Sequence, residues 1–293
     1  MTDPNQFDYA AQGPRQSQLW HERYLLFLQD VTAVFDGFKA LDIADLGIGH
    51  QELRVVVGPN GAGKTTMCDV ISGMTQPTTG KVFFDGEEIT GQNESVIAQR
   101  GVGRKFQIPN VFDSLTVREN MLLALPSPVH GIGTKYHRRT MDPRMAGPGG
   151  VALLRFIESC RTVGGKPGPE DRDRIEALLT RVNLIDDLET EAKNLSHGQR
   201  QWLAISSLML AKPRLLLVDE PAAGLTDSET ALTAELLLEM KNEHTIICIE
   251  HDMEFVRMLD SRVTVLDSGR VLAEGSLDQV SADEKVVEAY LGR

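Results

Sequence analysis

The chain has 293 residues, with 30 Lys or Arg against 42 Asp or Glu, so its formal net charge at pH 7 is −12. Its hydrophobic share of 41% and charged share of 25% are typical of a folded globular protein and exclude a wholly disordered one. An acidic chain without a long basic run lacks the electrostatic footprint of a nucleic-acid-binding protein. We therefore expect no nucleic-acid partner.

The N-terminal residues and the cysteines bear on the cellular compartment in which the protein works. Residues 1–23 are polar, with no apolar stretch of signal-peptide length, and predict a flexible N-terminal extension. Cys68, Cys160 and Cys248 form neither a zinc-binding pair nor a disulfide framework, which favours a reducing cytoplasm. The longest apolar runs fall far below the ~20 residues of a membrane helix. If the protein works at a membrane, we expect another subunit to span it.

The first elements in chain order are strands. Residues 24–28 and 31–35 form short strand-like runs, and the apolar run 53–57 predicts a buried strand that ends in a glycine-rich turn. After this turn, apolar side chains recur at helical spacing, at Met67, Val70, Ile71 and Met74. Residues 81–86 predict a further strand that closes in a turn. The order is therefore strand, glycine loop, helix, strand.

The second half contains helices and a repeated strand–helix alternation. Helical character begins near Thr116, and residues 126–169 are rich in Pro and Gly and predict loops. Helical spacing resumes at residues 175–182. The chain then alternates between a strand at 215–218, a helix at 232–240 and a strand at 245–249. Such alternation predicts a parallel α/β sheet, here split in sequence by a helical insert.

A phosphate-binding motif follows the first buried strand. Residues 58–65 read Gly58-Pro59-Asn60-Gly61-Ala62-Gly63-Lys64-Thr65 and fit the pattern GxxxxGK[ST] between a strand and a helix. Glycines allow backbone N–H groups and the helix dipole to converge on phosphate, while Lys64 reaches the β- and γ-phosphates. We expect Thr65 to bind Mg²⁺ and Thr66 to lie in the same nucleotide site. The alternative, a glycine turn that merely begins a helix, is disfavoured by this context.

Two carboxylates end a later strand. The run Arg214-Leu-Leu-Leu-Val-Asp-Glu220 delivers Asp219 and Glu220 at the carboxyl end of a buried strand, where open α/β sheets place their ligands. Asp219 is expected to orient the Mg²⁺ shell, and Glu220 to position the water that attacks the γ-phosphate. A strand that ends in two solvated acids is the alternative, and the phosphate loop in the same chain disfavours it.

A further glycine-containing motif precedes a helix. In Leu195-Ser196-His197-Gly198-Gln199, Ser196 and Gly198 lie at a helix N-terminus suited to an anion. Together, the phosphate loop, Phe106-Gln107, this motif (similar to LSGGQ), the Asp-Glu strand and a lone His251 after a final strand resemble an ABC-type ATPase. The resemblance covers roughly residues 24–293, and the order of the motifs makes it specific.

The resemblance implies a fold and a domain division. The fold is α/β: a P-loop NTPase (RecA-like) core of ABC type with an inserted α-helical subdomain and an N-terminal antiparallel β part. The implied ATP-binding core comprises residues 24–107 and 212–293, and the helical subdomain residues 108–211 with the Pro/Gly-rich insert. The implied cofactors are ATP and Mg²⁺.

The resemblance also implies a dimer in which each ATP lies between two chains. The phosphate loop of one chain would face the signature of the other, so Ser196, Gly198 and Gln199 would act on the partner's nucleotide. This sequence departs from the family pattern at His197, where a glycine is usual, and at Thr226, where an acid is usual and Asp227 follows instead. These departures leave the role of His197 and the contacts of that loop open.

Three further site residues come from the family pattern. Gln107 would sense Mg²⁺ and the attacking water, and His251 would contact the γ-phosphate as a switch residue. Phe35 matches the aromatic residue that stacks on adenine, although an ordinary core aromatic is the alternative. The remaining histidines show no metal-ligand spacing.

Within the family, local segments look like the ATP-binding subunit of importers for urea and short-chain amides, a branch of the branched-chain amino acid importer class. These segments are residues 103–112, 115–120, 195–202, 250–257 and 290–293. The resemblance implies a second ATP-binding subunit (the same or a related chain), two membrane permease subunits and, indirectly, a periplasmic solute-binding protein. The chain would lie peripherally at the cytoplasmic face of the inner membrane.

Three alternatives remain open. The first is an importer of branched-chain amino acids, and the second an exporter subunit that differs only in its partners. The third is a soluble ABC switch that acts in DNA repair or on ribosomes without a transporter. This third class is disfavoured because the chain has no sustained heptads for a long coiled coil and only one ATPase domain.

Overall fold

The computed structural model describes residues 23–105, 111–125 and 168–291. The chain forms two compact units, one comprising Met1–Asn110 with Lys212–Arg293 and the other Val111–Ala211. The predicted N-terminal extension, residues 1–23, lies outside the described residues except for Arg23, as does most of the Pro/Gly-rich segment. Within the described ranges, no helix combines the length and apolar composition that crossing a membrane demands.

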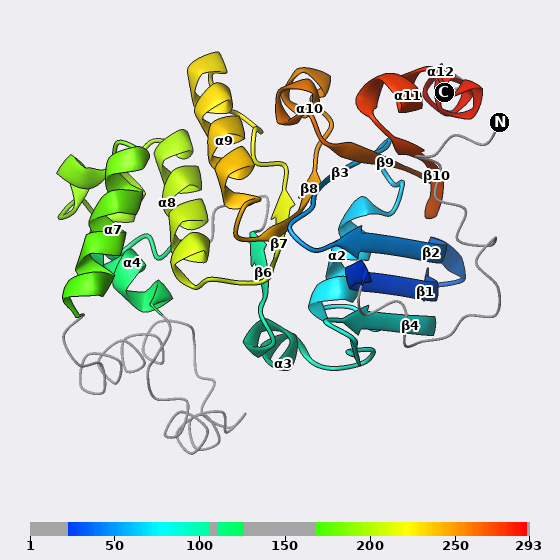
Figure 1. Ribbon diagram of the computed structural model, residues 1–293, viewed down its shortest axis with the longest axis horizontal. Helices are drawn as coiled ribbons and strands as arrows, with labels where there is room; N and C mark the ends of the chain where they lie inside the picture. Colours follow the sequence, from blue (N-terminus) through cyan, green and yellow to red (C-terminus); the bar gives the residue numbers. More distant parts are fainter. Residues whose placement is uncertain (1–22, 106–110, 126–167, 292–293) are drawn as a thin grey trace. The chain divides into compact units, whose positions relative to one another are not determined.

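The first unit contains a four-stranded antiparallel sheet (Figure 1). Its order is β2-β1-β4-β5, with bounds Phe38–Gly49, Tyr24–Phe35, Thr79–Phe84 and Glu87–Glu88. The expectation of two separate runs at 24–28 and 31–35 was wrong, because β1 is continuous across both. Asp30 adopts φ 49° and the β1–β4 register shifts between Gln29 and Thr32, so the polar interruption is a bulge.

The same unit contains a six-stranded sheet in the order β10-β9-β3-β8-β7-β6. Its strands, in chain order, are β3 (Leu53–Val57), β6 (Val102–Lys105), β7 (Leu215–Asp219), β8 (Thr245–Ile249), β9 (Arg262–Asp267) and β10 (Arg270–Gly275). All neighbouring pairs are parallel except β9–β10. Strands β3, β7 and β8 are buried along their whole length, as continuous apolar runs predict for a parallel sheet covered on both faces.

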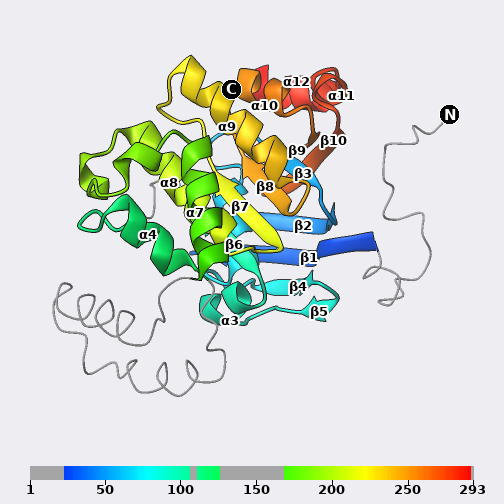
Figure 2. The ribbon, with the colours of Figure 1, turned by 60° about the vertical axis from the view of Figure 1, so that its left-hand side comes forward.

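Helices pack on these sheets (Figure 2). They are α2 (Lys64–Ser72), α3 (Glu94–Gln99), α9 (Asp227–Met240), α10 (Met253–Leu259), α11 (Leu277–Ser281) and α12 (Glu284–Leu291). Helix α2 contacts both β2 and β6, and its buried Met67 and Ile71 belong to one core with side chains of β1, β7 and β8. Since this core joins the two sheets, it holds the start of α2 against the carboxyl end of β3.

A buried arginine fixes β3 to its neighbours. The Arg54 side chain is 1% exposed, donates to Thr264 Oγ1 at 2.8 Å and to the Gly47 carbonyl at 3.3 Å, and pairs with Glu52 and Glu274. A buried guanidinium requires such partners, since an unpaired charge would cost several kcal/mol. The network therefore ties β3 to β2, β9 and β10.

The second unit is helical. It contains α4 (Val117–Ala124), α7 (Pro169–Arg181), α8 (His197–Leu210) and the short 3₁₀ turns Ile185–Asp187 and Ala192–Asn194. Helix α8 contacts α4 and α7, with Leu203 and Ile205 buried. The predicted fold, a P-loop α/β core with an antiparallel β part and a helical insert, is confirmed.

Candidate nucleotide-binding and hydrolysis site

The phosphate loop lies between β3 and α2, where the motif places it. Its conformation depends on glycines at both ends. A Cβ on Gly58 would lie 2.2 Å from the Leu266 carbonyl oxygen, and one on Gly63, where φ is +97°, would lie 2.5 Å from the Ala40 carbonyl oxygen. The Gly269 N–H donates to the Ala62 carbonyl at 3.0 Å. The turn between β9 and β10 therefore packs against the phosphate loop and helps to hold its conformation.

The start of α2 is available to an anion. The N-cap is Gly63, which supplies no side-chain acceptor, whereas Ser196 caps α8 and Thr226 caps α9 with their side chains. A helix that begins without a side-chain cap leaves its first N–H groups and the positive end of its dipole for another partner. Thr65, exposed, and Thr66, half-buried, lie in this first turn.

Lys64 folds back over the loop. Its ammonium donates to the carbonyl oxygens of Gly58 at 2.7 Å and Pro59 at 3.1 Å, and the residue is only 9% exposed. Burial lowers the pKa of Lys64, and the charges of Glu220 and Asp219 oppose that shift. A desolvated cation held by two neutral carbonyls gains most from an anion of high charge, such as a phosphate.

The two predicted carboxylates stand at the end of β7, in the same unit as the loop. Asp219 is buried and pairs in register with Ile249 of β8. Glu220 follows with φ at 44°, a left-handed conformation that costs a non-glycine residue about 1–3 kcal/mol. Its N–H donates to the Ile249 carbonyl at 3.0 Å, so β8 holds this conformation.

His251 lies beside Glu220. Its Nδ1 is 3.6 Å from Glu220 Oε1, and the side chains are 64% and 23% exposed. Both groups therefore face accessible space at the carboxyl edge of the sheet. The structure thus brings together, in the first unit, the phosphate loop, Asp219, Glu220 and His251, which were predicted from separate parts of the sequence.

The residues present fit ATP with Mg²⁺. In the described part of the chain no three His, Cys, Asp or Glu side chains gather as a metal site. Mg²⁺ in nucleotide sites needs no such cluster, because one or two protein oxygens and the phosphates complete its octahedron. The Thr65 hydroxyl and the Asp219 carboxylate would supply these protein oxygens, and the uncapped α2 N-terminus with Lys64 would supply phosphate donors.

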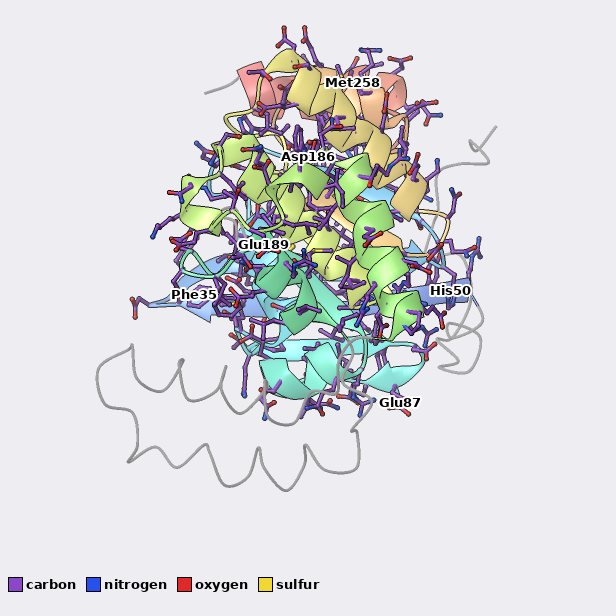
Figure 3. All side chains as sticks on the ribbon, turned by 90° about the vertical axis from the view of Figure 1, so that its left-hand side faces the viewer. Phe35, His50, Glu87, Asp186, Glu189 and Met258 are labelled. Atoms are coloured by element: carbon purple, nitrogen blue, oxygen red, sulfur yellow. The ribbon has the colours of Figure 1, made fainter. Side chains whose placement is uncertain are left out.

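Phe35 stands at the tip of the β1–β2 hairpin, opposite Phe38 in the register. It is 47% exposed, and Figure 3 shows it projecting at the end of the hairpin opposite His50. The alternative of a buried core aromatic is therefore wrong, because Phe35 belongs to no core cluster of the described residues. An exposed ring offers a face to a ligand, as adenine stacking requires.

The signature segment lies in the second unit and begins α8. Ser196 Oγ accepts the Gln199 N–H at 3.1 Å, and the Ser196 N–H donates to Gln199 Oε1 at 2.9 Å. These two bonds form a capping box, so both side chains already serve the helix start. His197 is exposed in the first turn and Gly198 is buried.

Gln107 and Thr226 are two further positions from the family pattern. Gln107 lies outside the described residues, and β6 ends at Lys105, opposite Val218 of β7. Thr226, which replaces the expected acid, is the N-cap of α9, and its N–H donates to Glu229 Oε2 at 2.9 Å. A threonine at this position therefore has a local structural cause, a second capping box.

Sequence reasoning assigned no role to Glu250. This carboxylate is fully buried at the end of β8, immediately before His251, and accepts the Ala222 N–H at 3.0 Å. Burial raises the pKa of Glu250 above its usual value, against hydrogen bonds from three backbone N–H groups. The signal that identified Glu220, an acid at the carboxyl end of an apolar strand, could have identified Glu250 also.

The chain is similar to a known family and to known proteins over most of its length. A family model described as "ABC transporter" matches residues 41–223, and one described as "Branched-chain amino acid ATP-binding cassette transporter" matches residues 270–293. The high-affinity branched-chain amino acid transport ATP-binding protein BraF of Pseudomonas aeruginosa is 34% identical over 272 residues, which cover 92% of this chain and 98% of BraF. LivG of Escherichia coli K12, described in the same words, is 33% identical over 270 residues, covering 92% and 98%.

Solved structures agree with these sequence relatives. The crystal structure of a nucleotide-free ATP-binding cassette from an ABC transporter aligns with a TM-score of 0.69 at 27% identity. The alignment covers 92% of this chain and 99% of the other. The ADP conformation of an ATP-binding cassette of an ABC transporter gives the same values. The likeness therefore extends over both units of the chain.

Proposed function

Because this chain belongs to the ABC transporter family and is one of its ATP-binding subunits, we propose that the site at the carboxyl edge of its parallel sheet hydrolyses ATP for the uptake of a small solute. ATPases of this family bind ATP with Mg²⁺ and couple its hydrolysis to transport. The observation that carries the proposal is the convergence of the phosphate loop, Asp219, Glu220 and His251 in one unit.

The geometry supports the following roles. Lys64 and the N–H groups at the uncapped start of α2 would bind the β- and γ-phosphates, and Thr65 with Asp219 would hold Mg²⁺. Mg²⁺ held there would neutralise charge that develops on the γ-phosphoryl group. Glu220 orients the attacking water, and His251 contacts the γ-phosphate from the neighbouring strand end.

Further residues complete the proposed site. Gln107 senses Mg²⁺ and the attacking water, and Phe35 stacks on adenine through its exposed ring. The signature residues Ser196, Gly198 and Gln199 act on the nucleotide of a second ATP-binding subunit, which is the same or a related chain. In support, Ser196 is exposed at the start of α8, where the positive end of the helix dipole favours an anion.

ATPases of this family dimerise and work with membrane permease subunits. We place this chain peripherally at the cytoplasmic face of the inner membrane, bound to two permease subunits that receive solute from a periplasmic binding protein. ATP binding closes the ATPase dimer, and hydrolysis with product release reopens it. This cycle drives alternating access in the permeases, since ATP favours one of two states.

For the solute, two candidates have separate support. Residues 103–112, 115–120 and 250–257 resemble the urea-type ATP-binding subunit, which favours urea or a short-chain amide. The relatives BraF and LivG carry names that specify branched-chain amino acids, which favours such an amino acid. Identity of about a third leaves room for either, because solute contacts lie in other subunits.

The test is uptake of labelled urea, acetamide and leucine in cells that lack this gene and carry either the wild-type chain or Glu220→Gln. Uptake of urea or acetamide with the wild-type chain alone would support the amide branch, and uptake of leucine alone the amino-acid branch. If no solute responds, the importer proposal fails. Copurification with ribosomes or DNA instead of membrane proteins would then favour a soluble ABC switch.

A further inference from the structure

Three strand ends meet around residues 249 and 250. In the register of the parallel sheet, Ile249 of β8 pairs with Val56 of β3 on one side and with Asp219 of β7 on the other. The Ile249 carbonyl accepts the Glu220 N–H at 3.0 Å. The Glu250 N–H donates to the Val56 carbonyl at 3.1 Å. The backbone here therefore joins the strand before the phosphate loop to the strand that carries Glu220.

The side chain of Glu250 extends this junction. Oε1 accepts the Ala222 N–H, two residues after Glu220, at 3.0 Å. Oε2 accepts the N–H of His251 at 3.1 Å and that of Asp252 at 3.5 Å. One carboxylate thus binds the loop that follows Glu220 with one oxygen and the turn that carries His251 with the other.

The chemistry of the site selects a carboxylate. Glu250 is fully buried, and its neighbours in these bonds are all N–H donors. An ionised carboxylate offers only acceptors, whereas an amide would direct an NH₂ group at one of these donors. A buried N–H without an acceptor costs about 1–3 kcal/mol. Nothing in these contacts requires Glu250 to reach a nucleotide.

One ring nitrogen of His251 lies near two carboxylates. Its Nδ1 is 3.6 Å from Glu220 Oε1 and 3.9 Å from Glu250 Oε2. The positive φ of Glu220 needs support on both sides of the residue. The Ile249 carbonyl gives this support at the Glu220 N–H, and Glu250 gives it two residues later.

We propose that Glu250 is a positioning residue for ATP hydrolysis. Its carboxylate binds the backbone N–H of Ala222, just after Glu220, and that of His251, and so fixes Glu220 and His251 relative to each other. The inference rests on the proposed roles of Glu220 and His251. A displacement of about 1 Å in such groups can lower turnover about 100-fold. Substitution of Glu250 should leave the strand before the phosphate loop in place, because the bond from the Glu250 N–H to the Val56 carbonyl involves no side chain.

The experiment measures kcat and KM for Mg-ATP hydrolysis by the full chain with Glu250→Gln, Glu250→Ala and Glu274→Gln. The last is a matched control, because Glu274 is a mostly buried carboxylate in the Arg54 network, outside the nucleotide site. We expect kcat to fall about 10- to 100-fold for both Glu250 variants with KM within about twofold of wild type. Glu274→Gln should keep both constants.

Wild-type kcat in both Glu250 variants would overturn the inference, as would parallel losses in the Glu250 variants and Glu274→Gln, which would indicate general destabilisation. Circular dichroism at the assay temperature establishes that each variant is folded. If Glu250→Ala does not fold, the isosteric Glu250→Gln decides. The Glu220→Gln variant distinguishes failure of the proposed site from failure of the positioning role. Wild-type turnover in Glu220→Gln would reject the proposed site. If Glu220→Gln loses turnover but the Glu250 variants keep it, only the positioning role is rejected.

Discussion

The imidazole Nδ1 of His251 lies 3.6 Å from Oε1 of Glu220, although the two residues end different strands, β8 and β7. The pair is largely exposed on the histidine side, so their attraction is screened by solvent. An exposed pair of this kind contributes little to folding. The free energy of unfolding should therefore depend little on this pair, whereas the proposed roles predict that ATP turnover depends strongly on it.

Replacing His251 should lower ATP turnover and leave the free energy of unfolding almost unchanged. For His251→Ala we expect turnover to fall about 100-fold or more, because the variant removes the group proposed to contact the transferred phosphoryl. The free energy of unfolding should change by less than about 1 kcal/mol, as for other exposed pairs. ATPase assays and urea denaturation measure the two quantities. His50→Ala, an exposed histidine beyond β2 (Figure 3), should leave both unchanged.

Lys64→Met should remove the response to ATP without weakening the nucleotide-free protein. The buried ammonium is held by two neutral carbonyls, and burial lowers its pKa, so its charge is costly without phosphate. We expect a nucleotide-free Tm equal to or above that of wild type, and no upward shift with Mg-ATP. Differential scanning calorimetry with and without Mg-ATP measures both. A Lys64→Met protein that ATP still stabilises would contradict the phosphate-loop assignment.

Two glycines of the same motif should differ in their tolerance of a methyl group. In Gly58→Ala the Cβ would lie 2.2 Å from the Leu266 carbonyl oxygen, and a backbone neighbour cannot move aside cheaply. We expect a loss of about 2–4 kcal/mol in unfolding free energy. In Gly61→Ala nothing lies within 4 Å of the Cβ, and only the positive φ of 79° is unfavourable. That loss should be about 1–2 kcal/mol.

Equal losses in chemical denaturation of these two variants would show that the contact between the loop and β9 does not exist in solution. Both variants should weaken ATP binding, because both residues belong to the loop. The comparison therefore depends on the unfolding free energy and not on activity.

Glu250 should give stability a defined pH dependence. Burial raises its pKa in the folded state, so the native protein holds this proton to higher pH than the unfolded chain. The stabilisation is complete below the unfolded pKa and is lost as pH rises through the folded pKa. The unfolding free energy of wild type minus that of Glu250→Gln should therefore decrease as the pH rises from the ordinary glutamate pKa, about 4.3, through the raised pKa of the folded state.

Glu88 provides a control of opposite sign. The hydrogen bond from Lys81 lowers the pKa of the Glu88 carboxyl, so its contribution is present above the unfolded pKa and lost as pH falls through the folded pKa. The difference between wild type and Glu88→Gln should therefore increase with pH and remain small, because the pair is exposed. Equal slopes for the two variants would reject the assignment of the raised pKa to Glu250.

The local sequence was enough to predict several buried strands, the phosphate loop and the acidic pair. The apolar runs of β3, β7 and β8 predicted buried strands, because a parallel strand covered on both faces needs apolar side chains at every position. The phosphate loop followed from glycine spacing, and Asp219 and Glu220 from their place at a strand end. Strand β2 was missed, since its alternation of buried Leu41 and Ile43 is lost by Leu46, and the glycines that follow weaken a strand pattern. The strand before His251, expected to be the final one, is followed by β9 and β10.

The tertiary structure alone decided which of these pieces meet. Sequence periodicity shows which face of an element is buried, but it does not show which strand is its neighbour, because pairing joins residues far apart along the chain. The placement of β8 between β3 and β7 brings His251 to Glu220 and the Glu250 carboxylate to the Ala222 N–H. The contact of Gly58 with Leu266 likewise depends on β9 lying beside β3. Sequence motifs identify the side chains of the site, whereas the order of the strands sets the distances between those side chains.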